Sequence, residues 1–286
     1  MSLYSRKQFF LNKNFNINTT KFCKATVGIS RDRVRFLILN KEERKIEMFS
    51  DYHISAKNVE EYTTGLINLF ESYKIFDYFL SHKIKIVLET DKFSLLPKNL
   101  FEQNDAESYL KFSCPMEKYL TFFAEDSYLP IAVAFGVREE INVWYEHISK
   151  KYNIYFTPSC LSIIKNANDF LEKKNLNAEQ KVVIFISQLR MHISIFYRNE
   201  LIFYNVINIE ENMEIIISSF LNILTTLNLD RYTHEVIVFG EINKKSTLIL
   251  NLKNYIKNIK ILYSKSFFSS SNFGYRKMFI KHIDLF

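Results

Sequence analysis

The sequence is poor in glycine and proline, with 5 and 4 residues respectively among 286. Because these residues dominate turns and low-complexity linkers, the chain is expected to have few long connections without secondary structure. No apolar run approaches the roughly 18–20 residues that a membrane-spanning helix requires. The polar, Asn-rich first 22 residues also lack the apolar segment of a signal peptide. These absences predict a protein with neither a membrane span nor a secretion signal.

Cysteine is also scarce, since the chain has only Cys23, Cys114 and Cys160. An odd and scattered set does not make a disulfide framework, and it favours a reducing compartment, so we expect a cytoplasmic protein. Cys160 lies near the start of an expected helix, where the pKa of a thiol can be lowered. No histidine is close to it in sequence, and we therefore expect an inert buried thiol.

Known catalytic signatures are missing as well. The chain has no Gly-x-x-x-x-Gly-Lys-Ser/Thr loop, no Gly-x-Gly-x-x-Gly fingerprint and no Gly-x-Ser-x-Gly elbow. Glu89 and Asp91 follow an expected strand and could form an acid–base pair, although acidic residues commonly cap turns at such positions. The histidines lack metal-site spacing, and we expect neither a metal nor a cofactor. They are His53, His82, His147, His192, His234 and His282.

Apolar residues are plentiful, with 48% of the chain apolar and 27 Phe and 17 Tyr, enough for a large core. Residues 25–54 alternate polar and apolar side chains, which predicts three strands joined by short charged turns. A helix with Asn58 as its N-cap is expected to follow over 58–73. A second meander over 182–207 precedes a helix over 210–227. The element order therefore repeats, with negligible identity between the halves, and predicts an α/β duplication.

The same patterns divide the chain into an N-terminal arm and two lobes. We expect the arm at 1–21, a first lobe at 22–174 with an insertion at about 91–125, and a second lobe at 175–286 with a basic C-terminal segment. The linker EKKNLNAEQ at 172–180 marks the boundary. Further strands are expected at 83–88, 117–124, 129–137, 153–157, 235–239 and 259–262, further helices at 104–111, 138–151, 159–171 and 244–255, and irregular structure at 93–101.

Five hydrophobic segments are distinctive: GISRDRVRFLIL at 28–39, FSLLPKNLF at 93–101, IAVAFGVREEINVWYEHI at 131–148, VIFISQLRMHISIFYRNELIFYN at 183–205 and VIVFGEI at 236–242. Together they resemble the corresponding segments of actin-like ATPases. The chain is identified as a member of an uncharacterised bacterial family of this fold, domain of unknown function 3822. It more distantly resembles the actin-like assembly proteins of pili and type II secretion. The resemblance implies duplicated ribonuclease H-like lobes, with mixed sheets flanked by helices.

The resemblance also implies that phosphate chemistry has been lost. ATP-binding members carry an Asp-x-Gly turn in each lobe, where the Asp holds metal or water and the Gly admits phosphate. The matching positions here are Gly28 and Ser30 in the first lobe and Phe185 and Ser187 in the second. Neither turn retains its carboxylate, so the resemblance implies a degenerate ATPase.

The adenosine motif is reduced to Gly240, followed by Glu241 in place of a second glycine. An ordinary strand-to-helix turn would also use a glycine at that position. The leading hypothesis is therefore a non-catalytic actin-like protein that acts as a protein-binding or assembly scaffold.

The net charge of +7 lies entirely in residues 241–286, because the rest of the chain sums to zero. Such a basic segment, with Phe267, Phe268, Phe273 and Tyr275 among it, suits a nucleic-acid- or ribosome-associated factor as an alternative. A chain rich in Lys, Asn and Ile through coding bias would show the same excess. A third alternative is a divergent nucleotide-binding phosphotransferase using Glu89, Asp91 or Glu241. The basic residues concerned are Lys244, Lys245, Lys253, Lys257, Lys260, Lys265, Arg276 and Lys277.

Overall fold

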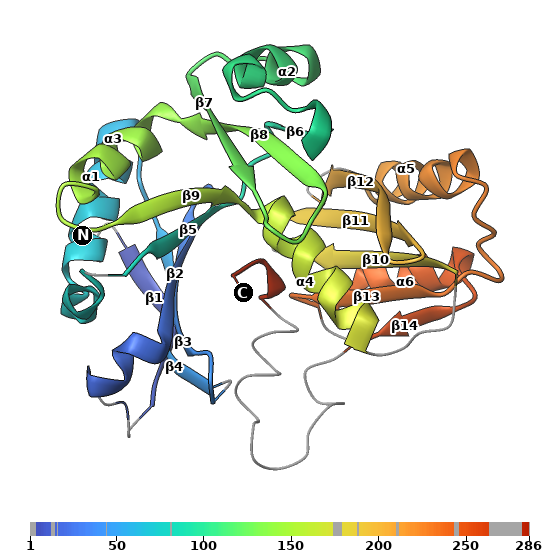
Figure 1. Ribbon diagram of the computed structural model, residues 1–286. Helices are drawn as coiled ribbons and strands as arrows, with labels where there is room; N and C mark the ends of the chain where they lie inside the picture. The colour runs from blue at the N-terminus through green and yellow to red at the C-terminus, as the bar shows by residue number, and fades with distance from the viewer. Residues whose placement is uncertain are drawn as a thin grey trace. The chain divides into compact units, whose positions relative to one another are not determined.

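The computed structural model divides into two compact units, called here the first and second lobes (Figure 1). It describes residues 4–12, 15, 17–43, 45–80, 82–173, 179–187, 189–209, 212–242, 246–262 and 282–285. The first lobe runs to Ser162 and includes Leu285, and the second begins at Ile163 and includes Asp284. The division falls inside helix α4 (Ser159–Lys173), ahead of the boundary predicted at 174/175. The predicted boundary lies at the end of α4, where the composition of the sequence changes. The observed division lies within α4 because it depends on which residues pack together.

The first lobe is built on a six-stranded mixed sheet. Its strands in spatial order are β1 (Tyr4–Leu11), β4 (Lys45–Ile54), β3 (Arg33–Asn40), β2 (Cys23–Ile29), β5 (Ile84–Leu88) and β9 (Ile154–Pro158). The first four pair antiparallel, and β5 and β9 run parallel to β2. Within the predicted arm at 1–21, β1 pairs with β4 as the edge strand of this sheet. Its exposed residues after Tyr4 follow no alternating pattern, so only backbone pairing with β4 identifies it.

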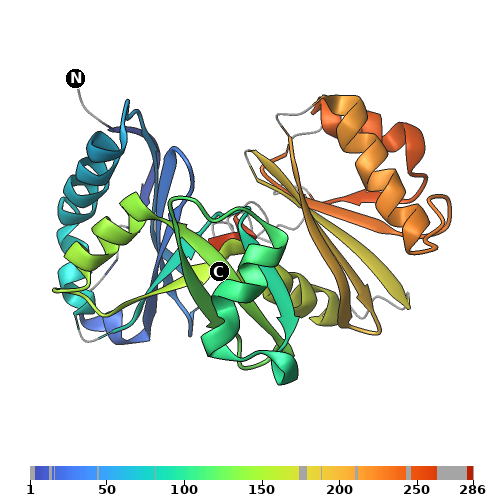
Figure 2. The ribbon, with the colours of Figure 1, turned by 90° about the horizontal axis from the view of Figure 1, so that it is seen from above.

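Helices α1 (Val59–Glu71) and α3 (Glu139–Ile148) cover one face of this sheet (Figure 2). The predicted N-cap is confirmed, since the Asn58 side chain accepts a hydrogen bond from the Glu61 amide at 2.8 Å. Aromatic rings fill the core, where Phe70 stacks on Phe76 with centroids 4.7 Å apart. Phe76 belongs to a 3₁₀ helix, η2 (Lys74–Phe79), which is too short to give a periodic signal in the sequence.

A separate three-stranded sheet belongs to the first lobe. Its order is β6 (Phe93–Pro97), β8 (Ile131–Arg138) and β7 (Tyr119–Glu125), with α2 (Ala106–Ser113) between β6 and β7 in the chain. Part of the segment predicted to be irregular, 93–101, is therefore strand β6. Pro97 is compatible with a strand here because β6 is an edge and Pro97 is its last residue. The predicted insertion at 91–125 contains β6, α2 and β7, and β8 completes their sheet.

The second lobe repeats the topology of the first. Its strands in spatial order are β12 (Glu200–Asn208), β11 (Arg190–Tyr197), β10 (Gln180–Ile186), β13 (Val236–Gly240) and β14 (Ile259–Ile261). An antiparallel meander again leads to two parallel strands, in the order of β4-β3-β2-β5-β9. Helices α5 (Met213–Thr226) and α6 (Thr247–Tyr255) cover one face (Figure 2). The predicted α/β duplication is confirmed.

Helix α4 continues from the first lobe into the second. At its start, Lys85 Nζ donates to Ser162 Oγ at 2.6 Å within the first lobe. Further along, the Phe170 ring lies 6.1 Å from that of Phe239 on β13 of the second lobe. Among the described residues, no helix is both long and apolar enough to cross a membrane.

Candidate functional site

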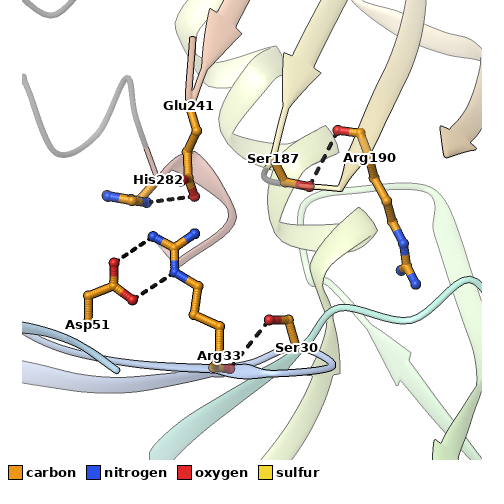
Figure 3. Close-up of polar contacts among 7 residues, drawn as sticks. All are labelled: Ser30, Arg33, Asp51, Ser187, Arg190, Glu241 and His282. Carbon is orange, nitrogen blue, oxygen red and sulfur yellow. Dashed lines mark hydrogen bonds and ion pairs between the residues drawn. The ribbon is translucent and has the colours of Figure 1, made fainter. Parts of the chain in front are cut away.

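The first hairpin turn of each lobe has the same hydrogen bonds. In the first lobe the Ser30 amide donates to the Arg33 carbonyl at 2.9 Å, and the Ser30 hydroxyl donates to the same oxygen at 3.4 Å. In the second lobe the Ser187 amide and hydroxyl donate to the Arg190 carbonyl at 2.9 and 3.3 Å (Figure 3). The serine amide of each turn is therefore engaged within its own turn.

A short repeat in the sequence encodes these two turns. Ile-Ser-x-x-Arg occurs at 29–33 and again at 186–190. The strand registers align the repeat further, because Gly28 pairs with Arg35 in the first lobe and Phe185 pairs with His192 in the second. Outside this repeat, the identity between the two halves is negligible. Aligning them on the first hairpin would have revealed this repeat.

Phe185, which the resemblance to actin-like ATPases matches to the carboxylate of the second turn, lies in the core. Its side chain is 1% exposed. The ring centroid lies 5.9 Å from that of Phe239 and 5.7 Å from that of His192. An aromatic ring offers no ligand to a metal ion or to metal-bound water, so this position has no means of organising magnesium and phosphate.

His192, beside Phe185, is a neutral core residue. It is 1% exposed, and its Nδ1 lies 2.8 Å from the Tyr204 hydroxyl. Burial lowers the pKa of the imidazole from 6.5 to about 3, and the charge of Arg190 acts in the same direction. The imidazole therefore stays uncharged at neutral pH, and proton transfer near pH 7 is outside its range.

Gly28, which the resemblance matches to the carboxylate of the first turn, is covered by Leu285, the penultimate residue of the sequence. A Cβ placed on Gly28 would come closer to Leu285 Cδ2 than real Cβ atoms come to any neighbour. The fully buried Leu285 side chain thus fills the space beside Gly28. Nearby, Arg33 binds Asp51 through two hydrogen bonds, from Nε at 2.7 Å and from Nη2 at 2.6 Å (Figure 3).

Gly240 has a structural reason to be glycine. Its φ is +121°, and a Cβ there would collide with the backbone of Ile186 on the neighbouring strand. The next amide, Glu241 N, donates to the Ile186 carbonyl at 2.7 Å. Glu241 Oε1 lies 3.6 Å from His282 Nδ1 (Figure 3). The retained glycine therefore follows from the close pairing of two parallel strands.

The sequence matches a known protein family over most of its length. Residues 12–259 match the family described as protein of unknown function, DUF3822. The chain belongs to the DUF3822 family. No curated protein matches it.

Solved structures similar to this DUF3822 chain include one with an actin-like ATPase fold. A Bacteroides thetaiotaomicron protein with an actin-like ATPase fold and unknown function is 20% identical, with a TM-score of 0.71 over 87% of this chain and 93% of that one. A chain of the PilM–PilN type IV pilus biogenesis complex is 8% identical, with a TM-score of 0.61 over 92% and 96% of the two chains. The cytoplasmic domain of EpsL, an inner membrane component of the Vibrio cholerae type II secretion system, is 9% identical, with a TM-score of 0.46 over 90% and 93%. The first two establish the actin-like fold of the DUF3822 chain.

The other candidate residues are spread over several elements of the chain. Glu89 and Asp91 follow β5, where the Glu89 amide donates to the Ile29 carbonyl at 2.9 Å. Burial raises the pKa of the Cys160 thiol to about 12, so the thiol stays protonated at neutral pH. Four of the other histidines have separate partners: His53 with Asp32, His147 with Glu71, His234 with Gln180 and His282 with Glu241. Within the described ranges, no group of three or more His, Cys, Asp or Glu could hold a metal ion.

Three of the eight predicted basic-patch residues are described. Lys253 lies on α6, and Lys257 and Lys260 follow it, all three exposed. Lys260 Nζ lies 3.7 Å from Glu235 Oε1. The remaining members and the aromatic cluster lie outside the described residues: Lys244, Lys245, Lys265, Arg276, Lys277, Phe267, Phe268, Phe273 and Tyr275. A basic surface for nucleic acid therefore stays a prediction.

Proposed function

We propose that this DUF3822 protein is an actin-like protein that works by binding another protein, without nucleotide chemistry at the usual phosphate turns. The observation that carries the proposal is the burial of Phe185, at 1% exposure, where ATP-binding relatives have a carboxylate. Phosphoryl transfer depends on metal ions and charged groups placed around the phosphates. A phenyl ring in this position supplies none of these.

The first turn supports the same conclusion independently. Gly28 has no side chain, and Leu285 fills the space above it. Asp51 is engaged by Arg33 in a short ion pair with both side chains largely buried, at 11% and 6% exposure for Arg33 and Asp51. A carboxylate held in this way is neutralised by its partner and is a poor ligand for a metal.

An apolar surface in the first lobe fits a protein partner. Five large exposed apolar side chains come from residues 100–128, the segment that holds α2 and β7, and Phe112 is 95% exposed. An open pocket of about 690 Å³ lies between α2 and β7 and is lined by charged residues, Glu107 and Lys111 among them, as well as by Met116, Leu120 and Phe122. Exposed apolar side chains that lie together are typical of protein-binding surfaces. The group consists of Leu100, Phe112, Leu120, Phe123 and Tyr128.

The shared fold with a chain of the PilM–PilN complex adds support of a different kind. That structure is a type IV pilus biogenesis complex, and so an actin-like fold there is part of a protein assembly. We propose an assembly role of this class for the DUF3822 chain, in the cytoplasm. The proposed partner is a protein segment that presents apolar side chains to the surface of α2 and β7.

A thermal-shift measurement with magnesium and ATP tests the nucleotide half of the proposal. We expect no shift in Tm at about 1 mM ATP and no phosphate release, since neither turn offers a carboxylate. A ligand with a Kd one hundred times below its concentration would stabilise the protein by about 2.7 kcal/mol, which such a scan resolves. Clear stabilisation, or hydrolysis abolished by Ser187→Ala, contradicts the proposal.

Substitutions on the apolar surface test the binding half. Phe112→Asp and Leu120→Asp are expected to abolish recovery of a partner that co-purifies with the tagged protein. Val59→Asp is the matched control, because Val59 is 60% exposed on α1, away from α2 and β7. Phe112→Asp is expected to change stability by less than roughly 0.5 kcal/mol, because an exposed side chain contributes little. A partner recovered equally with all three variants would place the interface elsewhere.

A further inference from the structure

Strand β1 is an open edge of the six-stranded sheet in the first lobe. Among the described strands it pairs with β4 alone, in antiparallel orientation along its whole length. The other side of its backbone therefore presents amide and carbonyl groups that no described strand takes up. An edge of this kind can pair with a strand of another chain.

The second half of β1 exposes three large apolar side chains in succession. Phe9, Phe10 and Leu11 are 48%, 49% and 45% exposed. Because successive side chains of a strand point to opposite faces, Phe9 and Leu11 lie on one face of the sheet and Phe10 on the other. Native edge strands usually avoid such exposure, so the side chains of β1 fit an edge that another strand covers.

The first half of β1 is basic. Arg6 and Lys7 are exposed, and β1 contains no acidic residue. The Arg6 guanidinium carbon lies 4.6 Å from the centroid of the Phe9 ring, and within the described ranges neither Arg6 nor Lys7 forms an ion pair. Lys7 is also the extra residue of a β-bulge between Arg6 and Gln8. The strand therefore combines an apolar half with two positive charges that have no carboxylate beside them.

These charges distinguish between two occupants of the edge. A second copy of the chain, paired antiparallel about a two-fold axis at the middle of β1, would bring Arg6 and Lys7 of both copies together. Like charges across adjacent strands are destabilising. An acidic strand would instead place carboxylates opposite Arg6 and Lys7, which attract them. The charges of β1 therefore favour an acidic strand over a second copy.

We propose that β1 binds an extended, acidic segment of another protein, which adds to the sheet antiparallel to β1. Its apolar residues cover Phe9, Phe10 and Leu11, and its carboxylates lie opposite Arg6 and Lys7. In an antiparallel pair the partner strand meets Leu11 first and Arg6 later, so its apolar half precedes its acidic half in sequence. This edge is separate from the surface of α2 and β7, and the proposal does not rest on the function proposed above.

A designed peptide serves as the probe for this edge. Its first three residues are valine, its fifth and sixth are glutamate and its other residues are threonine, with a fluorophore at its N-terminus. We expect a saturable rise in fluorescence anisotropy with the full chain. Reversal of both charges, by Arg6→Glu together with Lys7→Glu, is expected to weaken binding about tenfold or more and to create a preference for the same peptide with lysine in place of glutamate. Equal binding of the glutamate peptide by the wild type and the reversed chain would overturn the proposal.

Lys253→Glu together with Lys257→Glu is the matched control. Both side chains are exposed in the second lobe, and their reversal changes the net charge by the same amount. The affinity for the glutamate peptide is expected to stay within about twofold of the wild type, because exposed charges far from the peptide are screened by salt. A loss equal to that of the β1 reversal would mean that the peptide responds to the net charge of the chain and would contradict the proposal. The Tm of each variant checks its folding, and it is expected to be unchanged because all four side chains are exposed.

Backbone methylation separates strand addition from attraction between charges. Two versions of the glutamate peptide carry N-methyl groups on alternate amides, one at odd positions and the other at even positions. An added strand directs only one of these two sets of amides toward β1, so one version is expected to lose binding and the other to keep it. Equal affinities of the two versions would rule out an added strand.

Sedimentation of the protein without peptide tests the second copy as the occupant. We expect Phe10→Asp to leave the sedimentation coefficient unchanged, because repulsion between the basic halves keeps two copies of β1 apart. A wild-type dimer that Phe10→Asp dissociates would show that a second copy covers the edge, and the acidic partner would then be wrong.

Discussion

Lowering the pH from 7 to 4 is expected to destabilise the protein by about 3 kcal/mol through His192 alone. Burial holds the pKa of His192 at about 3 in the folded protein, against 6.5 for the ordinary side chain. The unfolded chain therefore takes up a proton below pH 6.5 while the folded chain does not. Stability is complete above that pH and falls progressively until the pH reaches about 3. Denaturant unfolding at several pH values measures the slope.

His192→Gln isolates this contribution from that of the carboxylates. Glutamine can still hydrogen-bond to the Tyr204 hydroxyl and has no proton to gain, so the variant is expected to lose less stability between pH 7 and 4 than the wild type. His147→Gln serves as the matched control, because the His147 side chain is 47% exposed beside Glu71 and solvent screens that pair. Parallel profiles for wild type and His192→Gln would show that the imidazole is accessible to protons in the folded state.

The parts of the fold that could be predicted are those in which side chains alternate or recur periodically. The meanders at 25–54 and 182–207 bury alternate apolar residues, and Asn58 begins a helix whose apolar face is regular. Strand β1 escaped prediction because its seven residues after Tyr4 are all exposed, so its side chains carry no pattern. Strand β6 was not predicted because Pro97 suggested a loop. A proline at the end of an edge strand removes no backbone hydrogen bond between the strands, so it is compatible with β6.

The candidate site was predictable only where it depends on local sequence. The positions of Gly28, Ser30, Phe185 and Ser187 follow from the first hairpin of each lobe, which the resemblance to actin-like proteins locates. Their surroundings come from residues far apart in the chain. No local pattern relates Leu285 to Gly28, or Phe239 to Phe185, because these contacts arise from tertiary packing.

Replacement of Phe185 by alanine is expected to destabilise the protein by about 3–5 kcal/mol, the range for loss of a large aromatic side chain from a packed core. The ring is 1% exposed and lies close to the rings of Phe239 and His192. Its removal leaves a cavity that these rigid rings cannot readily fill. Phe185→Leu keeps most of the apolar volume and is expected to cost less than about 1.5 kcal/mol. Denaturant unfolding at pH 7 compares the three proteins.

Phe185→Asp separates the structural role of this position from a catalytic one. It restores the residue that ATP-binding relatives carry, yet it is expected to be more destabilising than Phe185→Ala, because a carboxylate between aromatic rings is desolvated. Phe112→Ala is the control, since Phe112 is 95% exposed and its loss should change stability by less than roughly 0.5 kcal/mol. A Phe185→Asp protein that is stable and binds magnesium with ATP would mean that the turn keeps its phosphate geometry. The expected outcome is a weaker fold without nucleotide binding, because the ring at position 185 has become part of the core of the second lobe.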